Sequence, residues 1–464
     1  MAPSYAQVSV SPHRTGLLRR AGIPFTLFIL VYVTHFFSGV IASGDSRWVV
    51  PGAKSIIEEG NTNLDEYADM LRENDYYWVD RIDGHWYNRF PIGMTALATP
   101  FVYVIDRGAA WLFRTRPSLE EYIRAHCSKP IYRVDVITMY WRVELVIACF
   151  IIASAALFMY LAARSSFPPS WAFASALVFT FATSAWSTGS RSLGQHGGSM
   201  LMMSMALCAA LHAKNRPWLI QFMSLPLAFS YLIRPTNGIP ILALTIYVLL
   251  QYRRFFIPYM LWTLPIVIPW LAYNLHIYHA LFPSYYSAAR QLGTTHFADA
   301  LAGLLVSPGR GLFIYSPVYF LSMAGVWVKW KERTLDKLDA LLAATIVAHW
   351  ITLASFGDWW GGHSYGPRYF SDLTPFFVFL LFPAMQKLRS PPGKARATWA
   401  AAFVVTIGIS LFMHYQGAGN LRCWDWNREP VDVNSAPERL WDWRDPPFLR
   451  GLTKGYPPPR TTLH

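Results

Sequence analysis

Long uncharged, apolar stretches alternate with short polar segments along nearly the whole chain. A helix needs about 20 mainly apolar residues to cross the hydrocarbon core of a bilayer, and eleven stretches approach this length. The pattern therefore predicts an all-α polytopic membrane protein with a bundle of about eleven transmembrane helices. The stretches lie at about 22–43, 143–163, 171–187, 198–213, 217–233, 238–251, 256–273, 312–328, 338–356, 373–386 and 398–414.

A twelfth apolar stretch, 91–113, carries Asp106 and Arg107 about two thirds of the way along. If this stretch does not cross the bilayer, the short loops on the side of the N-terminus hold sixteen Lys and Arg residues and those opposite hold five. If it crosses, every later loop changes side, against the tendency of Lys and Arg to collect in short cytoplasmic loops. We therefore expect 91–113 to be re-entrant or to lie on the membrane surface, with the N-terminus cytoplasmic and the C-terminus exterior.

In this topology the long polar segments all face the exterior. Residues 1–414 form the transmembrane domain, in which 44–142 is a first exterior loop, and 415–464 form an exterior tail. Further exterior loops are expected at 274–311 and 357–372. Loops of this length are usually functional, so the pattern predicts that the protein acts on the non-cytoplasmic face.

Composition supports a membrane protein and removes one class of partner. Only 14% of the residues are charged, well below the roughly 25% of soluble domains. The net charge of +13 follows from basic cytoplasmic loops, so no nucleic acid is expected as a partner. Cys149 and Cys208 lie within predicted spans, whereas Cys127 and Cys423 lie in exterior segments; these two either pair in an oxidising exterior or remain unrelated thiols.

Ionisable residues gather at the outer ends of the predicted spans. Inside the spans His35 and His349 are the main exceptions, although transport normally needs such groups near the bilayer midplane. Arg binds phosphate oxygens bidentately, so a ring of Arg suits a substrate with an anionic head group and a lipid tail. Each Arg taken alone could instead anchor its helix at the interface. The outer-end residues are Asp45, Arg47, Arg191, His196, Arg234, Arg310, Asp358, His363 and Arg368.

Several segments, taken in order from about residue 25 to the C-terminus, resemble the polytopic C-type (GT-C) glycosyltransferases, the superfamily of the protein mannosyltransferases and the lipid A aminoarabinose transferase. The tail CWDWNREPVDVNSAPERLWDWRDPPFLRG also looks like the tails of bacterial members. The other segments are GDSRWVVPGAKSIIEEGNTNLDEY, NRFPIGMTALATPF, SRSLGQHGGSM, LIRPTNGIP, SPGRGLFIYSPVYF and DWWGGHSYGPRYFSDLTPFF.

This resemblance implies a GT-C-like bundle, juxtamembrane helices in the first exterior loop and a place in the bacterial inner (plasma) membrane with the active site facing the periplasm. It implies a polyprenyl-phosphate-linked sugar donor, a glycan, lipid or protein acceptor, and usually inversion at the anomeric carbon. The essential acidic residue of the family lies just after the first span, where this chain has Asp45. A second acidic residue of several members is absent from STGSRSLGQHGG, so a divalent cation (Mg²⁺ or Mn²⁺) is left open and no metal ligand is assigned.

The chemistry of such a transfer suits Asp45. The acceptor hydroxyl must lose its proton as it attacks the anomeric carbon, and a carboxylate within hydrogen-bond reach can accept that proton as a general base. Arg47, two residues on, could pair with Asp45 and hold it ionised. Alternatively, Asp45 caps the helix expected near Ala53.

The leaving phosphate needs fixed positive charge where negative charge develops. We favour Arg368 because the segment GGHSYGPRY places it beside flexible glycines and two tyrosines. The full set of candidates for binding the donor phosphate is Arg368, Arg310, Arg234, Arg191 and Arg47.

Aromatic and histidine side chains in the exterior loops are candidates for binding the substrate. Their rings could stack on pyranose faces, although aromatic belts at membrane interfaces also explain Trp and Tyr in such places. Two alternatives to a glycosyltransferase stay open: a polysaccharide polymerase or ligase with a diphosphate-linked donor, and a transporter or flippase of a lipid-linked substrate. The candidate substrate-binding residues are His196, His363, Tyr365, Trp359 and Trp360.

Overall fold

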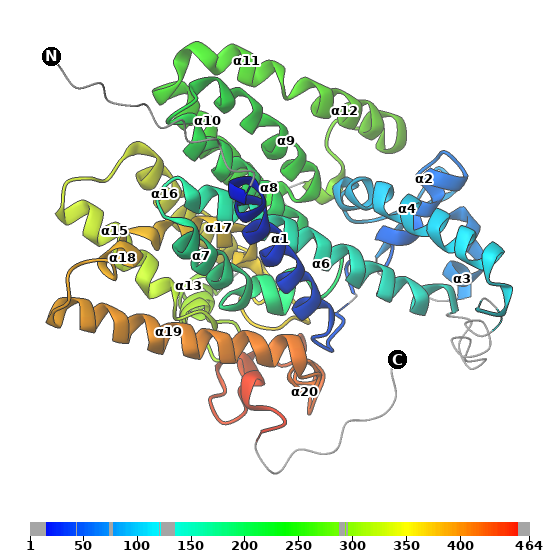
Figure 1. Cartoon of the computed structure of the whole chain (residues 1–464). Coiled ribbons are helices and arrows are strands. Elements are labelled where there is room, and N and C mark those ends of the chain that lie inside the picture. The colour runs from blue at the N-terminus through cyan, green and yellow to red at the C-terminus, as the bar shows by residue number, and fades with distance from the viewer. Residues whose placement is uncertain are drawn as a thin grey trace, which may run out of the picture.

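The computed structural model of the chain is mostly helical (Figure 1) and describes residues 15–42, 44–73, 78–119, 121, 135–286, 293 and 296–452. Within these residues, four helices are long and apolar enough to cross a membrane, and several shorter apolar helices accompany them. Many large apolar side chains on these helices are exposed, as expected where lipid rather than water surrounds a bundle. These features indicate an integral membrane protein. The four long helices are Tyr140–Arg164, Arg253–Tyr278, Lys337–Ala354 and Lys394–Gly419.

The centre of the bundle is α6 (Asp135–Arg164), which packs against α1 (Thr15–Phe36), α7 (Pro169–Phe181) and α8 (Gln195–Ala213) (Figure 1). The buried face of α6 is rich in alanine, and small side chains let helix backbones approach closely. After α7 the chain makes one π-helical turn, η2 (Ala185–Gly189), before α8 begins. The loops at the ends of α1, α7 and α8 therefore meet close to one another.

The second half of the chain surrounds this centre. The helices α9 to α12 lie together on one side (green in Figure 1), and α10 packs against α16. The bounds are η3 Pro217–Met223, α9 Ser224–Ile233, η4 Pro235–Asn237, α10 Gly238–Gln251, η5 Arg253–Phe255, α11 Phe256–Leu261, α12 Leu264–Tyr278, η6 Ser284–Tyr286, α13 Phe297–Val306, α14 Leu312–Tyr315, α15 Tyr319–Lys331, α16 Lys337–Ala354, η8 Arg368–Leu373, α17 Thr374–Leu380, α18 Phe382–Lys387, α19 Lys394–Gly419, α20 Arg422–Asp425, η9 Pro437–Trp441 and η10 Pro447–Leu449.

Two predicted spans are interrupted, so the expectation of one continuous helix for each was wrong. The stretch 312–328 divides into α14 and α15, and 373–386 divides into α17 and α18. Pro317 lies between α14 and α15, and proline stands in the first turn of α17 and α18. Proline lacks an N–H and clashes with the preceding turn, so it starts a helix more readily than it continues one.

The first loop forms a separate lobe beside the bundle (blue and cyan in Figure 1). Trp48, Leu64, Leu71 and Val79 give this lobe a small apolar core of its own. An antiparallel hairpin, which the sequence analysis did not predict, turns at Asp83 and Gly84 with positive φ at both residues, as a tight hairpin turn requires. The elements are α2 Val49–Glu58, η1 Asp65–Tyr67, α3 Ala68–Glu73, β1 Val79–Ile82, β2 His85–Asn88 and α4 Gly93–Thr115.

The ambiguous stretch 91–113 is a single helix, α4, packed along α2 and against the C-terminal part of α9. It is not among the helices of the described chain that are long and apolar enough to cross a membrane. Its placement on the membrane surface stays a prediction.

We expect Gly93→Ala to destabilise the contact between α4 and α9. A Cβ at Gly93 would lie 2.4 Å from the carbonyl carbon of Leu232, and overpacking of this kind costs roughly 1–3 kcal/mol. Gly108→Ala is the matched control on the same helix, because a Cβ there meets nothing within 4 Å. Thermal unfolding in detergent measures both; equal midpoints for the two variants would contradict the packing described here.

Candidate active site

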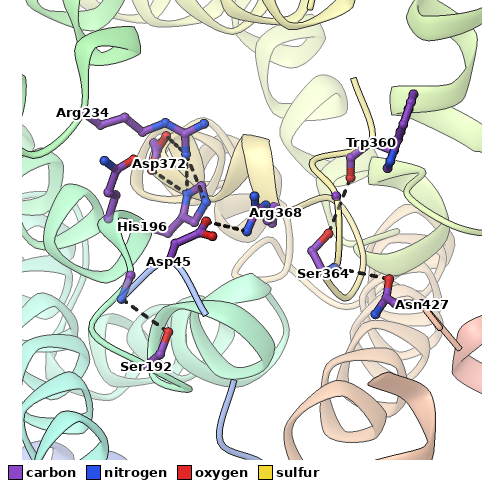
Figure 2. Close-up of polar contacts among 12 residues, drawn as sticks. Asp45, Ser192, His196, Arg234, Trp360, Ser364, Arg368, Asp372 and Asn427 are labelled. Carbon is purple, nitrogen blue, oxygen red and sulfur yellow. Dashed lines mark hydrogen bonds and ion pairs between the residues drawn. The ribbon is translucent and has the colours of Figure 1, made fainter. Parts of the chain in front are cut away.

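Asp45 lies in the turn that follows the end of α1. Its carboxylate is 40% exposed, and its Oδ2 lies 3.1 Å from Nη1 of Arg368. The two residues are 323 positions apart in the chain, so the pair depends on the tertiary fold. Figure 2 shows both side chains pointing into one group with His196, Arg234 and Asp372.

The backbone before Arg368 lets its side chain fold back toward Asp45. Gly361, Gly362 and Gly366 all have positive φ, a conformation that glycine adopts without strain. A Cβ at Gly361 would lie 2.9 Å from Nε of Arg368. Burial lowers the pKa of the Arg368 guanidinium, but the neighbouring Asp45 and Tyr369 outweigh burial and raise this pKa above its ordinary value, so Arg368 stays charged.

One turn further on, Asp372 forms a second, fully buried charge pair. Its Oδ2 lies 3.1 Å from Nη1 of Arg234, and its Oδ1 lies 3.0 Å from Nδ1 of His196. His196 contacts both members of this pair, because Arg234 Nη1 lies 2.7 Å from its Nδ1 and 3.0 Å from its Nε2 while Nδ1 also lies near Asp372. Burial raises the pKa of Asp372, but Arg234 and His196 outweigh burial and lower it below its ordinary value. Asp372 is therefore ionised at neutral pH.

The Tyr369 ring joins the two pairs. The guanidinium carbons of Arg234 and Arg368 lie 5.2 Å and 5.6 Å from its ring centroid, within the range of cation–π attraction. His349 Nε2 lies 3.3 Å from the Tyr369 carbonyl oxygen, to which it can donate. We call the set Asp45, His196, Arg234, Arg368, Tyr369 and Asp372 the outer polar cluster.

The two arginines of this cluster differ in what they can bind. Arg234 is held by a carboxylate with no exposed surface, so an incoming anion would have to displace a buried partner. Arg368 is held by the partly exposed Asp45, which an incoming anion can replace. The cluster can therefore accept one anionic group at Arg368 and release the Asp45 carboxylate at the same place.

Arg191 and Arg310 lie outside this cluster, and both are buried in backbone contacts. Arg191 donates to the carbonyls of His35 and Val40, and so fixes the end of α1. Arg310 donates to the carbonyls of Gly309, Trp360 and Gly362 and to Asn427 Oδ1. Their guanidinium groups already bind protein oxygens, so the geometry does not support either as a phosphate ligand.

Arg47 does not form the pair with Asp45 that its place two residues on in the sequence suggested. Its guanidinium carbon is 5.3 Å from the centroid of the Trp78 ring, and Asp45 pairs with Arg368 instead. Asp45 does not make a capping contact to α2 either, because no side chain caps that helix and its N-cap residue is Trp48. The helix-cap alternative is therefore wrong.

Four of the five candidate substrate-binding residues hold the 357–366 loop against the tail or the bundle. His363 Nε2 lies 2.8 Å from Asp432 Oδ2, and Trp360 Nε1 donates to Asn434 Oδ1 at 2.9 Å. Buried Tyr365 donates to the Met413 carbonyl, and Trp359 packs on Gly303. Trp360 and its neighbours lie apart from the outer polar cluster in Figure 2. Of the five, the structure brings only His196 into the cluster.

Tyr369, Asp372 and Tyr285 belong to the site but were not singled out from the sequence. Burial and the charge of Asp45 raise the pKa of Tyr285 to about 12 against the opposing effect of Arg234. Its hydroxyl lies 3.4 Å from Gln195 Oε1. The four-residue spacing of Arg368 and Asp372 was a usable signal, since both face the site from one short helix.

In the part of the chain that the structure describes, no three His, Cys, Asp or Glu residues come together as candidate metal ligands. We therefore assign no residues to a divalent cation. Cys423 is buried against Gln416 and Arg450, whereas Cys127 lies outside the described residues.

No protein family and no curated protein matches this sequence. The fold is similar to that of the Archaeoglobus fulgidus oligosaccharyltransferase solved with a tethered acceptor peptide containing the NVT sequon, with a TM-score of 0.52 and 12% identity over 95% of this chain and 61% of that one. The apo form of the same enzyme matches with a TM-score of 0.41 and 13% identity over 96% and 61%. This chain thus spans about three fifths of the length of that enzyme, and the similarity to the peptide-tethered form supports the GT-C-like fold expected from the sequence.

Proposed function

We propose that this protein is a membrane glycosyltransferase that moves a sugar from a polyprenyl-phosphate donor to an acceptor on the non-cytoplasmic face. The observation that carries the proposal is the partly exposed Asp45–Arg368 pair, a carboxylate and an exchangeable cation at the outer polar end of an oligosaccharyltransferase-like fold. The exterior placement rests on the basic residues of the opposite loops.

In the proposed reaction the donor phosphate binds Arg368 and takes the place of the Asp45 carboxylate. The released carboxylate accepts the proton of the acceptor hydroxyl as its oxygen attacks the anomeric carbon. The bond from that carbon to the phosphate oxygen breaks, and its electron pair leaves with polyprenyl phosphate, whose new negative charge Arg368 stabilises. Attack opposite to the leaving group inverts the anomeric carbon.

The supply of cations favours a monophosphate-linked donor over a diphosphate-linked one. Arg191 and Arg310 bind backbone oxygens, and Arg234 binds buried Asp372. Within the outer polar cluster this leaves Arg368 as the cation with an exchangeable partner. One guanidinium can bind one phosphate bidentately, whereas a diphosphate would carry a second anionic group without a matching cation in the cluster.

The decisive experiment incubates the purified protein in detergent with polyprenyl-phosphate sugars and an acceptor panel of glycans, lipids and peptides. We expect free polyprenyl phosphate and a new glycosidic bond in equal amounts. Turnover of diphosphate-linked donors alone would favour a polymerase or ligase. Movement of donor across vesicle membranes with no new bond would favour a transporter.

Arg368→Ala should weaken donor binding roughly 10- to 100-fold, because hydrogen bonds to charged groups contribute about 1.5–3 kcal/mol. It should also slow transfer, since the same cation holds phosphate in the ground state and in the transition state. Arg368→Lys should restore only part of both, because an ammonium cannot form the bidentate contact. Arg428→Ala, an exposed arginine of the tail, is the control. Normal donor affinity in Arg368→Ala would move the phosphate site elsewhere.

A further inference from the structure

Glu144, in the outer part of α6, is a carboxylate with no exposed surface. Its Oε2 accepts a hydrogen bond from Ser46 Oγ at 2.5 Å and a longer one from the Leu193 backbone N–H at 3.4 Å. A buried carboxylate is costly unless hydrogen bonds compensate for lost water. The position of this charge therefore needs a reason beyond filling space.

The contacts of Glu144 with Ser46 and Leu193 lead directly to the outer polar cluster. Ser46 is buried and follows Asp45 in the chain. Leu193 lies two residues before Gln195, the first residue of α8, whose second residue is His196. One carboxylate thus holds the turn that carries Asp45 and the loop that sets the start of α8.

A second set of contacts joins the same two segments. The Ala42 N–H donates to the Arg191 carbonyl at 3.0 Å, and the Arg191 guanidinium donates to the Val40 carbonyl at 3.2 Å. Residues 40–42 are therefore already paired with Arg191. Glu144 extends this pairing, through Ser46, to the side of the turn where Asp45 stands.

We propose that Glu144 is a positioning residue, whose carboxylate holds the Asp45 turn in line with Arg368 and the first turn of α8. This inference rests on the proposed function, because it assigns Glu144 the task of orienting the base of that reaction. The helix that carries it, α6, packs against α1, α7 and α8, so it offers a rigid support. Ionised acceptors form shorter and stronger hydrogen bonds than neutral ones, which explains a carboxylate here rather than an amide.

The test compares Glu144→Gln, Ser46→Ala and the double variant. An amide keeps the shape and one acceptor oxygen, but it cannot form the charge-assisted bond. We expect kcat to fall by about 10- to 100-fold, the order of effect that a misplacement of about 1 Å produces, with the donor Kd within about threefold of wild type. The double variant should be no slower than the slower single variant, because both changes remove one contact. Ser46→Thr keeps the hydroxyl and should recover most of the rate.

Ser55→Ala is the matched control. Ser55 is a second buried serine of the same loop and also donates to a glutamate, Glu66. It lies on α2, away from the cluster, so its loss should leave kcat unchanged.

Three outcomes would overturn the inference. These are a wild-type kcat in Glu144→Gln, independent effects of the Ser46 and Glu144 changes, or an equal loss of rate in Ser55→Ala. If Glu144→Gln does not fold, the kcat values of Ser46→Ala and Ser46→Thr are compared instead. Equal values would overturn the inference. If Asp45→Asn is slow but Glu144→Gln and Ser46→Ala have the wild-type rate, only the positioning role of Glu144 is rejected. If Asp45→Asn itself has the wild-type rate, the proposed role of Asp45 as general base is rejected.

Discussion

Asp45→Asn should slow sugar transfer by about 10²- to 10⁴-fold, the usual contribution of a general base. The amide keeps the size of the side chain but cannot accept the proton of the acceptor hydroxyl. Because Asp45 pairs with Arg368, the substitution also frees that guanidinium. We therefore expect donor binding to be unchanged or tighter while kcat falls, a combination that a general loss of structure would not produce.

The measurement is single-turnover transfer together with donor binding at equilibrium. Asp432→Asn is the matched control, since Asp432 also forms a partly exposed pair, with His363, but lies outside the outer polar cluster. A monodisperse Asp45→Asn protein that binds donor and turns over at the wild-type rate would exclude Asp45 as the base.

Asp372→Asn should destabilise the protein by about 3–5 kcal/mol, because removal of one partner of a buried pair leaves the other charge uncompensated. Arg234 would remain in a nearly dry environment opposite a neutral amide. The folded pKa of Asp372 lies below its ordinary value of 3.8, so the stabilisation by its charge is complete above that value. It is lost only as the pH falls through the lower folded pKa, and the full effect is expected at neutral pH.

Thermal unfolding in detergent at neutral pH measures this effect. Asp83→Asn is the control, because Asp83 and its partner His279 are each 66% exposed and exposed pairs contribute only about 0–1 kcal/mol. Replacing both buried partners, as in Asp372→Leu with Arg234→Met, should cost less than Asp372→Asn alone. An unfolding midpoint of Asp372→Asn equal to that of Asp83→Asn would show that the charge of Asp372 is not needed.

Local sequence was sufficient for the helical class and for most helix positions. Long apolar stretches between charged loops predicted α6, α10, α16 and α19, because burial in lipid and backbone hydrogen bonding act on each stretch by itself. The same stretches did not reveal the breaks at α14–α15 and α17–α18. A proline there could equally have kinked a continuous helix, so only the packing around it separates the two outcomes.

The sequence also pointed to Asp45 and Arg368, through segment order and the glycines before Arg368, but it could not choose among five arginines. Arg191 and Arg310 donate to backbone carbonyls of other residues. In the sequence such an arginine has the same side chain and the same loop-end position as one whose partner an incoming anion can replace. Their difference lies in which carbonyls and carboxylates come within about 3 Å of the guanidinium, and distant segments supply these.

Asp45 meets Arg368 across 323 residues, and Glu144 meets Ser46 across 98. Composition and hydropathy, which act locally, thus determined a helical membrane protein with its candidate site residues near the ends of helices. Long-range packing alone decided which of those groups form the site, because short-range electrostatic contacts exist only once the helices that carry them are in place.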